Sequence, residues 1–239
     1  MSAPEPGFGP LGASRSAVRP AVVELVGVAA SGKTSLLRAL GRADPTLRAG
    51  LRPPRIRHLA QILPLLPTFL ALHWPYRGFL RKEMKRITYL RTVYGMLHAE
   101  LPGRPHAVIL DEGPVYMLAR LRVYGAERIR TAAFERWWRG TVAQWARTVD
   151  LIVWLDAPDT ILLQRSRSRA QVHQLQRLSD VRAQQFLASY RQAYETVVSA
   201  LTELSGPAVL RVRSDHQGVE ATRDQVLSEL RLITARPSG

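Results

Sequence analysis

Eight residues near the start of the chain, Gly27–Thr34, read GVAASGKT and match the pattern G-x-x-x-x-G-K-[ST]. The valine-rich run 21–26 before them predicts a buried strand, and the run 35–40 after them predicts a helix. Glycines in this pattern let backbone N–H groups crowd around a phosphate, and the helix N-terminus adds positive potential. We therefore expect a phosphate-binding loop between a strand and a helix, which is the context that confirms this motif.

The same motif predicts the roles of individual residues. Lys33 is expected to reach the β- and γ-phosphates of a bound triphosphate, and Thr34 is expected to offer its hydroxyl to Mg²⁺. A glycine turn that arises by chance is the alternative, and the flanking strand and helix argue against it. The residues expected to bind phosphate are Gly27, Ala30, Ser31, Gly32, Lys33, Thr34 and Ser35.

The length of 239 residues fits one α/β domain, at about 20–235. Residues 1–19 are rich in Pro, Gly, Ala and Ser, which predicts a disordered lead-in without the apolar segment of a secretory signal. The absence of cysteine excludes disulfides, thiolate zinc sites and cysteine nucleophiles. It is also compatible with a cytoplasmic protein.

The net charge of +15 comes almost entirely from arginine, since the only lysines are Lys33, Lys82 and Lys85. A surface of this sign attracts polyanions such as nucleotides, phosphorylated metabolites or nucleic acid. A compositional bias toward arginine is the alternative explanation. The chain carries no helix-turn-helix, RNP-type or zinc signature, which argues against nucleic acid as a partner. The sequence leaves a homodimer open.

The most apolar stretch, residues 59–74, is interrupted by Pro64 and Pro67 and is too short to span a bilayer. We expect no stable membrane insertion. We interpret the stretch as a helical cover over a substrate pocket, within a helical substrate-binding region at about 48–101. A helix that lies on a membrane surface is the alternative.

Several apolar runs predict buried parallel strands, because helices cover such strands on both faces. These runs are Ala21–Val26, Ala107–Leu110, Leu151–Leu155 and Val209–Val212. A further strand within Thr46–Arg55 has only a weak signal, because prolines and arginines interrupt it. Strands that alternate with helical patterns predict a doubly wound α/β domain.

Apolar stripes at helical spacing predict three long helices, over Ile87–Glu100, Arg130–Thr148 and Gln184–Leu204. The tryptophans of the second helix follow the same spacing, which favours core packing over stacking against bases. In the third helix the stripe includes Tyr190 and Tyr194, which we expect to point inward.

Two carboxylates, Asp111 and Glu112, follow the predicted strand 107–110, and Gly113 and Pro114 come next. Ligands of open α/β sheets lie at this carboxyl edge of the strands. We expect Asp111 to hold Mg²⁺ through water, because magnesium keeps several waters. Glu112 is either a general base for an attacking hydroxyl or a residue that supports the metal-binding group. A solvated turn is the alternative for the whole segment.

A second charged segment follows the predicted strand 151–155. Residues 155–159 open a helix that carries Arg165 and Arg169, which are four residues apart and would share one face. Two guanidinium groups on one face can clamp a phosphoryl group in transfer. We therefore predict a lid at about 165–180, with a solvated basic helix face as the alternative. His173 is interpreted as a structural residue of this lid.

Taken together, these segments resemble the thymidylate kinases and deoxynucleoside kinases. The resemblance rests on the phosphate loop, on Asp-Glu-Gly after the third strand, on Leu-Asp-Ala-Pro followed by Arg-x-x-x-Arg, and on the strand at 209–215. It covers about residues 22–230. It implies a three-layer P-loop NTPase fold with a five-stranded parallel sheet, a helical substrate cover and a lid. It also implies a phosphotransferase that uses ATP and Mg²⁺.

The chain departs from this group at the position of Glu112, where these kinases usually have an arginine. No Glu-Pro motif marks the second strand, where deoxynucleoside kinases carry their base, and Glu112 could take over that task. The resemblance implies transfer to a nucleoside, a nucleotide or a similar hydroxyl or phosphate acceptor, and the departure at Glu112 leaves the choice among them open. Lys82, Arg86 or Arg91 could receive an anionic acceptor, which would favour a nucleotide over a nucleoside.

Two other classes of function are alternatives to a small-molecule kinase. A GTP-binding switch generally uses an Asn-Lys-x-Asp motif, which a chain without asparagine cannot contain. A P-loop NTPase without an acceptor, or a protein that binds nucleic acid or another anionic ligand, is the remaining alternative.

Overall fold

The computed structural model describes residues 19–51, 53–54, 62–73, 81–99, 105–124, 131–168 and 174–235. Five strands in this part of the chain form one sheet. They are β1 (Ala21–Val26), β2 (Leu47–Ala49), β3 (Ala107–Leu110), β4 (Leu151–Asp156) and β5 (Ala208–Arg213). The three inner strands are almost entirely buried, as expected for a parallel sheet with helices on both faces.

The sheet has the strand order β2-β3-β1-β4-β5, and all of its pairs are parallel. Strand β1 is central and pairs with β3 on one side and with β4 on the other. The chain first fills the β2-β3 side and then crosses to the β4-β5 side. The carboxyl end of β1 is therefore the point at which the winding direction changes, and ligands of open α/β sheets bind there.

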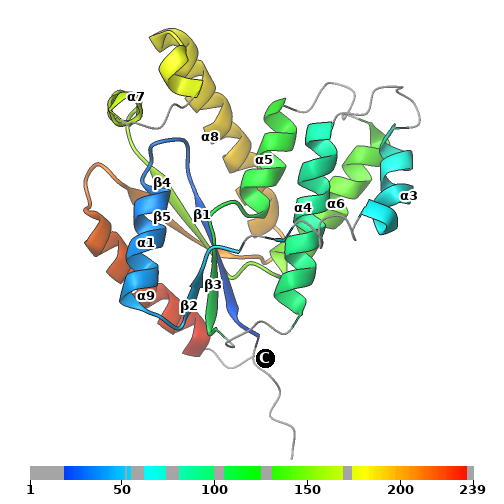
Figure 1. The fold of residues 1–239 in the computed structure, drawn as a ribbon, viewed down its shortest axis with the longest axis horizontal. Helices are drawn as coiled ribbons and strands as arrows, with labels where there is room; N and C mark the ends of the chain where they lie inside the picture. Colours follow the sequence, from blue (N-terminus) through cyan, green and yellow to red (C-terminus); the bar gives the residue numbers. More distant parts are fainter. Residues whose placement is uncertain are drawn as a thin grey trace, which may run out of the picture.

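Helices cover both faces of the sheet and give the domain three layers (Figure 1). Helices α1 (Lys33–Ala43) and α9 (Val219–Ala235) pack against each other on one face. On the other face lie α4 (Arg81–His98), α5 (Pro114–Tyr124) and α8 (Asp180–Thr202). This arrangement confirms the three-layer α/β fold with a five-stranded parallel sheet.

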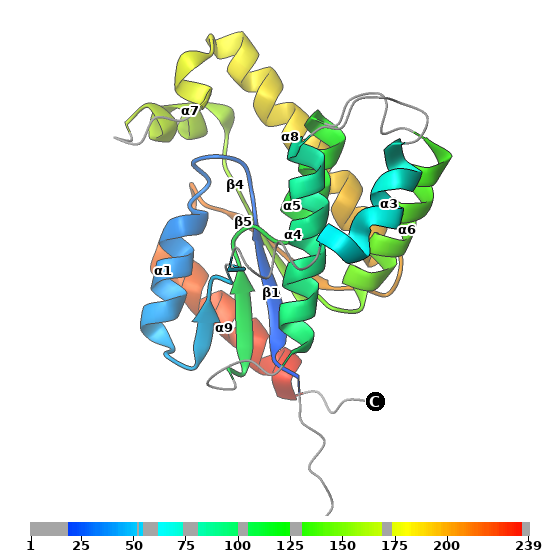
Figure 2. The same ribbon diagram turned by 45° about the vertical axis from the view of Figure 1, so that its right-hand side comes forward.

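Two further helices extend the layer that contains α4, α5 and α8. Helix α6 (Ala132–Ala146) packs on α8, and α3 (Ile62–His73) packs against both α4 and α6 at the outer side of this layer (Figure 2). Helix α7 (Asp159–Arg167) and the 3-10 turn η2 (Gln174–Arg177) lie between β4 and α8 in the sequence and contact each other.

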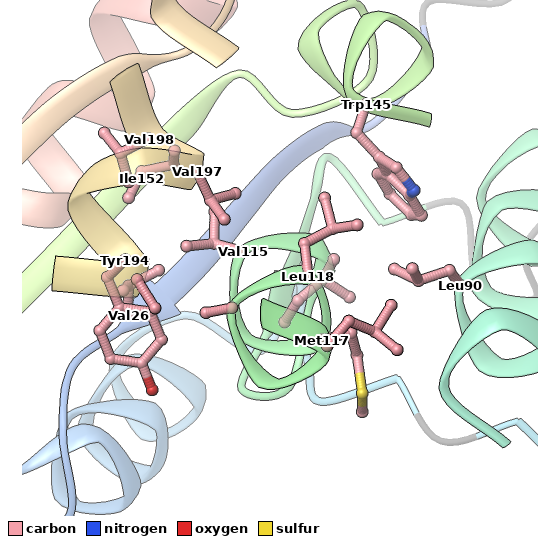
Figure 3. Close-up of a cluster of buried hydrophobic side chains, with 14 of the residues drawn as sticks. Val26, Leu90, Val115, Met117, Leu118, Trp145, Ile152, Tyr194, Val197 and Val198 are labelled. Carbon is pink, nitrogen blue, oxygen red and sulfur yellow. The ribbon is translucent and has the colours of Figure 1, made fainter. Parts of the chain in front are cut away.

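Alternate residues of the strands point into two separate cores. In β1, Val23 and Leu25 belong to the core under α1 and α9, whereas Val22 and Val26 belong to the core under α4, α5 and α8. Figure 3 shows the second core, where Leu118 of α5 lies among side chains of neighbouring helices. The core therefore fixes α5, and with it the loop that leads from β3 into α5.

The predicted strands are confirmed to within one residue at each end. The weak signal in Thr46–Arg55 corresponds to β2, which is only three residues long and lies at the edge of the sheet. The three predicted long helices are confirmed as α4, α6 and α8, although α4 and α8 begin earlier than expected, at Arg81 and Asp180.

The proline-containing apolar stretch forms α3, whose third and sixth residues are Pro64 and Pro67. Pro64 lies in the first turn and costs no hydrogen bond, because the first N–H groups of a helix have no partner within the helix. Pro67 lies in the second turn, where a proline removes one hydrogen bond of the helix. Within the described part of the chain, no helix combines the length and the apolarity that a membrane crossing requires.

Candidate functional site

The loop Gly27–Thr34 joins β1 to α1 and has a backbone that needs glycine at two positions. Gly27 has φ +153°, and a Cβ there would lie 2.3 Å from the carbonyl oxygen of Leu155. Gly32, which precedes α1, has φ +103°. Both values lie in the region that L side chains rarely adopt. The sequence motif is therefore seated between a strand and a helix N-terminus, as predicted.

Two polar side chains of the loop, those of Lys33 and Ser31, differ in their hydrogen bonds. The Lys33 ammonium donates to the carbonyl oxygens of Gly27, at 2.5 Å, and of Val28, at 3.1 Å. The Ser31 hydroxyl is buried and has no hydrogen-bond partner among the described residues. An orphan hydroxyl, a lysine and the N-terminus of a helix fit a phosphate group, because each of them can donate a hydrogen bond or offer positive charge.

A cavity of about 330 Å³ opens over this loop. All eight residues of Gly27–Thr34 line it, and so do Asp111 and Glu112 from the end of β3. Ser35, the last residue predicted to bind phosphate, does not line it. The described chain gathers no group of three or more metal-ligating side chains. Thr34 and Asp111 nevertheless fit Mg²⁺, which binds one or two carboxylates and completes its shell with substrate phosphates and water.

The two carboxylates are positioned by a third one, Glu24, which the sequence analysis did not single out. Glu24 lies in the middle of β1 and is fully buried. Its carboxyl oxygens accept from the backbone N–H of Val115, at 2.9 Å, and of Tyr116, at 3.0 Å. These N–H groups belong to the first turn of α5, where they have no partner within the helix. Glu24 thus ties the start of α5 to the strand that carries the phosphate loop.

Glu24 also explains the sequence Gly113-Pro114. A Cβ on Gly113 would lie 2.5 Å from the Glu24 Cδ atom. Pro114 is the first residue of α5, where its fixed φ suits the helix and its missing N–H costs nothing. Burial raises the pKa of Glu24 to about 8, although backbone N–H groups of residues 113, 115 and 116 act in the opposite direction.

We expect Gly113→Ala to lower the free energy of unfolding by about 2–4 kcal/mol, because the new methyl group overlaps the buried Glu24 carboxyl. Urea denaturation measures this change. Gly95→Ala is the matched control, since a Cβ at Gly95 meets no heavy atom within 4 Å. Equal stability of the two variants would contradict the close contact between Gly113 and Glu24.

One wall of the cavity is aromatic. Tyr116 of α5 and Phe186, Tyr190 and Tyr194 of α8 line it. The Tyr194 hydroxyl lies 3.4 Å from the carbonyl oxygen of Gly27. The sequence pattern predicted Tyr190 and Tyr194 as inward-pointing core residues, and both are buried. Their position in the lining of the phosphate cavity could not be predicted, because helical spacing does not reveal which loop a buried helix face contacts.

Behind Tyr116 lie two arginines. Arg120 donates to the Tyr116 hydroxyl at 2.7 Å. Arg86 of α4 is buried, and its pKa is lowered by burial and by the nearby charge of Arg120. Glu83 lies 3.5 Å from Arg86 and offsets part of this charge. Glu112, whose charge also acts on Tyr116, lies on the same side of the cavity, so this wall carries charges of both signs.

The predicted arginine clamp is not assembled in the described structure. The Arg165 guanidinium donates to the Oγ and the carbonyl oxygen of Ser214, at 2.9 and 2.8 Å, and does not line the cavity. Helix α7 ends at Arg167, so the described part of this helix includes Arg165 and not Arg169. Arg169 and His173 lie outside the described residues. A role of Arg165 and Arg169 in phosphoryl transfer stays a prediction.

A different arginine, Arg191 of α8, joins the elements around the cavity. Its guanidinium binds both carboxylate oxygens of Asp156, at 2.8 and 3.2 Å, and an oxygen of Asp159, at 2.6 Å. It also donates to the carbonyl oxygen of Ala157 at 2.9 Å. Bidentate pairing of this kind fixes orientation as well as distance. Arg191 therefore holds α8 to the junction of β4 and α7.

The residues that were predicted to bind an anionic acceptor do not lie together. Arg86 lies behind the phosphate cavity, whereas Arg91 lines another cavity together with Leu65 of α3. Among the described residues, α3 therefore contributes to this second cavity and not to the phosphate cavity. Its role as a helical cover over a substrate pocket stays a prediction. The side chain of Lys82 lies outside the described part of the chain.

No protein-family model matches the sequence, and no curated protein matches it. Solved structures do match. The deoxyadenosine kinase of M. mycoides with dCMP and dCDP aligns with a TM-score of 0.52 and 11% identity, over 89% of this chain and 99% of that chain. The chain has the fold of the nucleoside and thymidylate kinases.

Two further structures agree. The YorR protein of Bacillus subtilis, in complex with phosphorylated GDP, has a TM-score of 0.53 and 12% identity, over 91% of this chain and 99% of that chain. Thymidylate kinase from Candida albicans has a TM-score of 0.55 and 12% identity, over 92% of this chain and 96% of that chain. At these identities the likeness concerns the fold, and a shared fold does not by itself imply a shared reaction.

Proposed function

We propose that the protein is an ATP- and Mg²⁺-dependent kinase that transfers the γ-phosphoryl group to a small anionic acceptor, of the nucleoside monophosphate type. The observation that carries this proposal is the shared cavity of Gly27–Thr34 with Asp111 and Glu112. A loop that binds phosphate and carboxylates that suit a metal meet there at the carboxyl edge of the sheet. That combination is what phosphoryl transfer requires.

The polar and the aromatic residues of the cavity have different roles in this proposal. The loop N–H groups and Lys33 bind the β- and γ-phosphates and stabilise the charge that develops on them. Thr34 and Asp111 hold Mg²⁺, which neutralises phosphate charge when it is bound. The aromatic wall of Tyr116, Phe186, Tyr190 and Tyr194 excludes water and offers flat surfaces to a base.

The two arginines near Tyr116 favour an acceptor that carries a phosphate. Arg86 and Arg120 attract such a group, and Glu83 and Glu112 offset part of this attraction. A phosphate acceptor arrives with its attacking oxygen already deprotonated. Glu112 is therefore needed as a general base only if the acceptor presents a hydroxyl.

The test is a panel of nucleosides and nucleoside monophosphates with ATP and Mg²⁺, in which ADP formation is measured. We expect turnover with a monophosphate, a KM for it that Arg120→Met raises about tenfold or more, and an unchanged KM for ATP. Arg122→Met is the matched control, because Arg122 stacks on Trp138 and pairs with Glu135 instead.

ADP formation that does not depend on any acceptor would support a simple NTPase and contradict the kinase. Turnover confined to uncharged hydroxyl acceptors, with a large loss of kcat in Glu112→Gln, would contradict the anionic acceptor and assign Glu112 as the base.

A further inference from the structure

A second cavity, of about 560 Å³, lies between α3, α4 and α6. It shares none of its described lining residues with the cavity over Gly27–Thr34. Figures 1 and 2 show these three helices on the outer side of the helical layer, and α5 lies between them and the phosphate loop. Its volume falls in the range of small-molecule sites, about 300–1,000 Å³.

The floor of this cavity is apolar and rigid. Leu65 of α3, Leu90 of α4 and Trp145 of α6 are all buried and all line it. The ring of Tyr94 meets Trp145 edge to face, with centroids 5.8 Å apart, and joins α4 to α6. The half-buried ring of Trp137 forms a side wall. Such a surface accepts the apolar body of a ligand.

The rim of the cavity is positively charged from two sides. Arg91 belongs to α4 and Arg136 to α6, and both are exposed. The described lining residues include no aspartate or glutamate. An apolar floor with two guanidinium groups at its mouth selects a ligand that carries a carboxylate, sulfonate or phosphate on an apolar body.

Two glycines keep the cavity open. Gly95 lies within α4 and Gly140 at the middle of α6, and both line the cavity. A Cβ at either position would meet no heavy atom within 4 Å. Neither position has a positive φ. Glycine inside a helix lowers stability relative to alanine, and at these positions neither close packing nor backbone conformation requires it.

We propose that the α3/α4/α6 cavity is a second binding site, for a small organic anion with an aromatic or acyl body. The body lies on Trp137, Trp145 and Leu90, and the anionic group pairs with Arg91 and Arg136. This site is separate from phosphoryl transfer and does not depend on the proposed function.

A second copy of the chain is a poorer occupant of this cavity. In a two-fold contact the same surface patch faces itself, and the described lining of this patch offers no carboxylate to Arg91 or Arg136. The net charge of +15 also opposes such a contact.

The test uses 1-anilinonaphthalene-8-sulfonate as the probe, in fluorescence titrations of the full-length protein. N-phenyl-1-naphthylamine, which has a similar body without the sulfonate, is the matched ligand. We expect one sulfonate probe per chain, bound equally with and without ATP. Arg136→Met should weaken its binding about tenfold and leave the uncharged probe unaffected. Arg139→Met, at an exposed arginine of α6 outside the cavity lining, should change neither.

Gly140→Leu should fill the cavity and abolish binding of both probes, with a melting temperature equal to or above that of the wild type. Gly95→Leu tests the same point from α4. Displacement of the probe by ATP, or undiminished binding in both leucine variants, would overturn the proposal. So would a dimer in sedimentation experiments that Gly140→Leu dissociates, since the cavity would then be an interface between two copies.

Discussion

Replacing Lys33 by alanine is expected to lower acceptor-dependent ADP formation by about a hundred- to a thousandfold. The Lys33 ammonium lies over the phosphate loop, within hydrogen-bond distance of two of its carbonyl oxygens. A bound triphosphate offers it stronger, charged partners, and its interaction with the γ-phosphate oxygens matters most when charge builds up on them during transfer. The loss should therefore appear mainly in kcat. Steady-state kinetics with a saturating acceptor measure it.

Lys85→Ala is the matched control for this variant, because Lys85 is an exposed lysine of α4. Its kinetics should equal those of the wild type. Thermal unfolding of Lys33→Ala checks that the loop, which loses two hydrogen bonds to its carbonyl oxygens, leaves the domain folded. If a folded Lys33→Ala protein kept more than about a tenth of the turnover, the role given to this lysine would be wrong.

The second large effect concerns Glu24 and appears in stability as a function of pH. Its pKa is about 8 in the folded protein, because burial outweighs the backbone N–H groups that it accepts, and 4.5 is its ordinary value. Between these two values the unfolded chain loses the proton while the folded protein keeps it. Unfolding therefore becomes easier as pH rises through this window, and the effect is constant below and above it.

Each pH unit inside the window costs about 1 kcal/mol of stability, and the whole window costs several kcal/mol. Glu24→Gln removes the titrating group and keeps an oxygen that can accept from the first turn of α5. The difference in unfolding free energy between Glu24→Gln and the wild type should therefore shift in favour of the variant, by about 1 kcal/mol per unit, from pH 5 to pH 7.5.

Urea denaturation at several pH values measures this difference, and all other titrating groups cancel in it. Glu203→Gln, which removes one exposed carboxylate in the same way, is the matched control. A difference between Glu24→Gln and the wild type that does not vary with pH would mean that Glu24 is ionised in the folded protein, with its charge stabilised by the N–H groups of α5.

The sequence predicted the features of this fold that depend on residues close together in the chain. The inner strands are continuous apolar runs, and the loop Gly27–Thr34 carries its own pattern between a strand and a helix. Strand β2 has no comparable pattern, because it is three residues long at an edge and its Ala49 is exposed. Such a strand is recognised by its pairing with β3.

The parts of the site that the sequence did not predict depend on contacts across the chain. Glu24 and Val115 are 91 residues apart, and nothing near either of them reveals that they bind. The same holds for Arg191 and Asp156. For Arg165 and Arg169 the spacing was read on a continuous helix, but α7 ends at Arg167. Arg91 was recognised as lying off the apolar stripe, although the cavity that it lines could not be foreseen.

The hydrogen bonds of Arg191 hold α8 between two of its aromatic residues, Phe186 and Tyr194. Tyr194 lies on the side where the helix packs against α5 and the sheet, and its hydroxyl is close to Gly27. Phe186 lies before Arg191 in the sequence of α8 and lines the same cavity. Arg191 therefore fixes α8 at a position between two aromatic residues of the cavity wall. The shape of that wall depends on the ion pairs of an arginine that does not itself line the cavity.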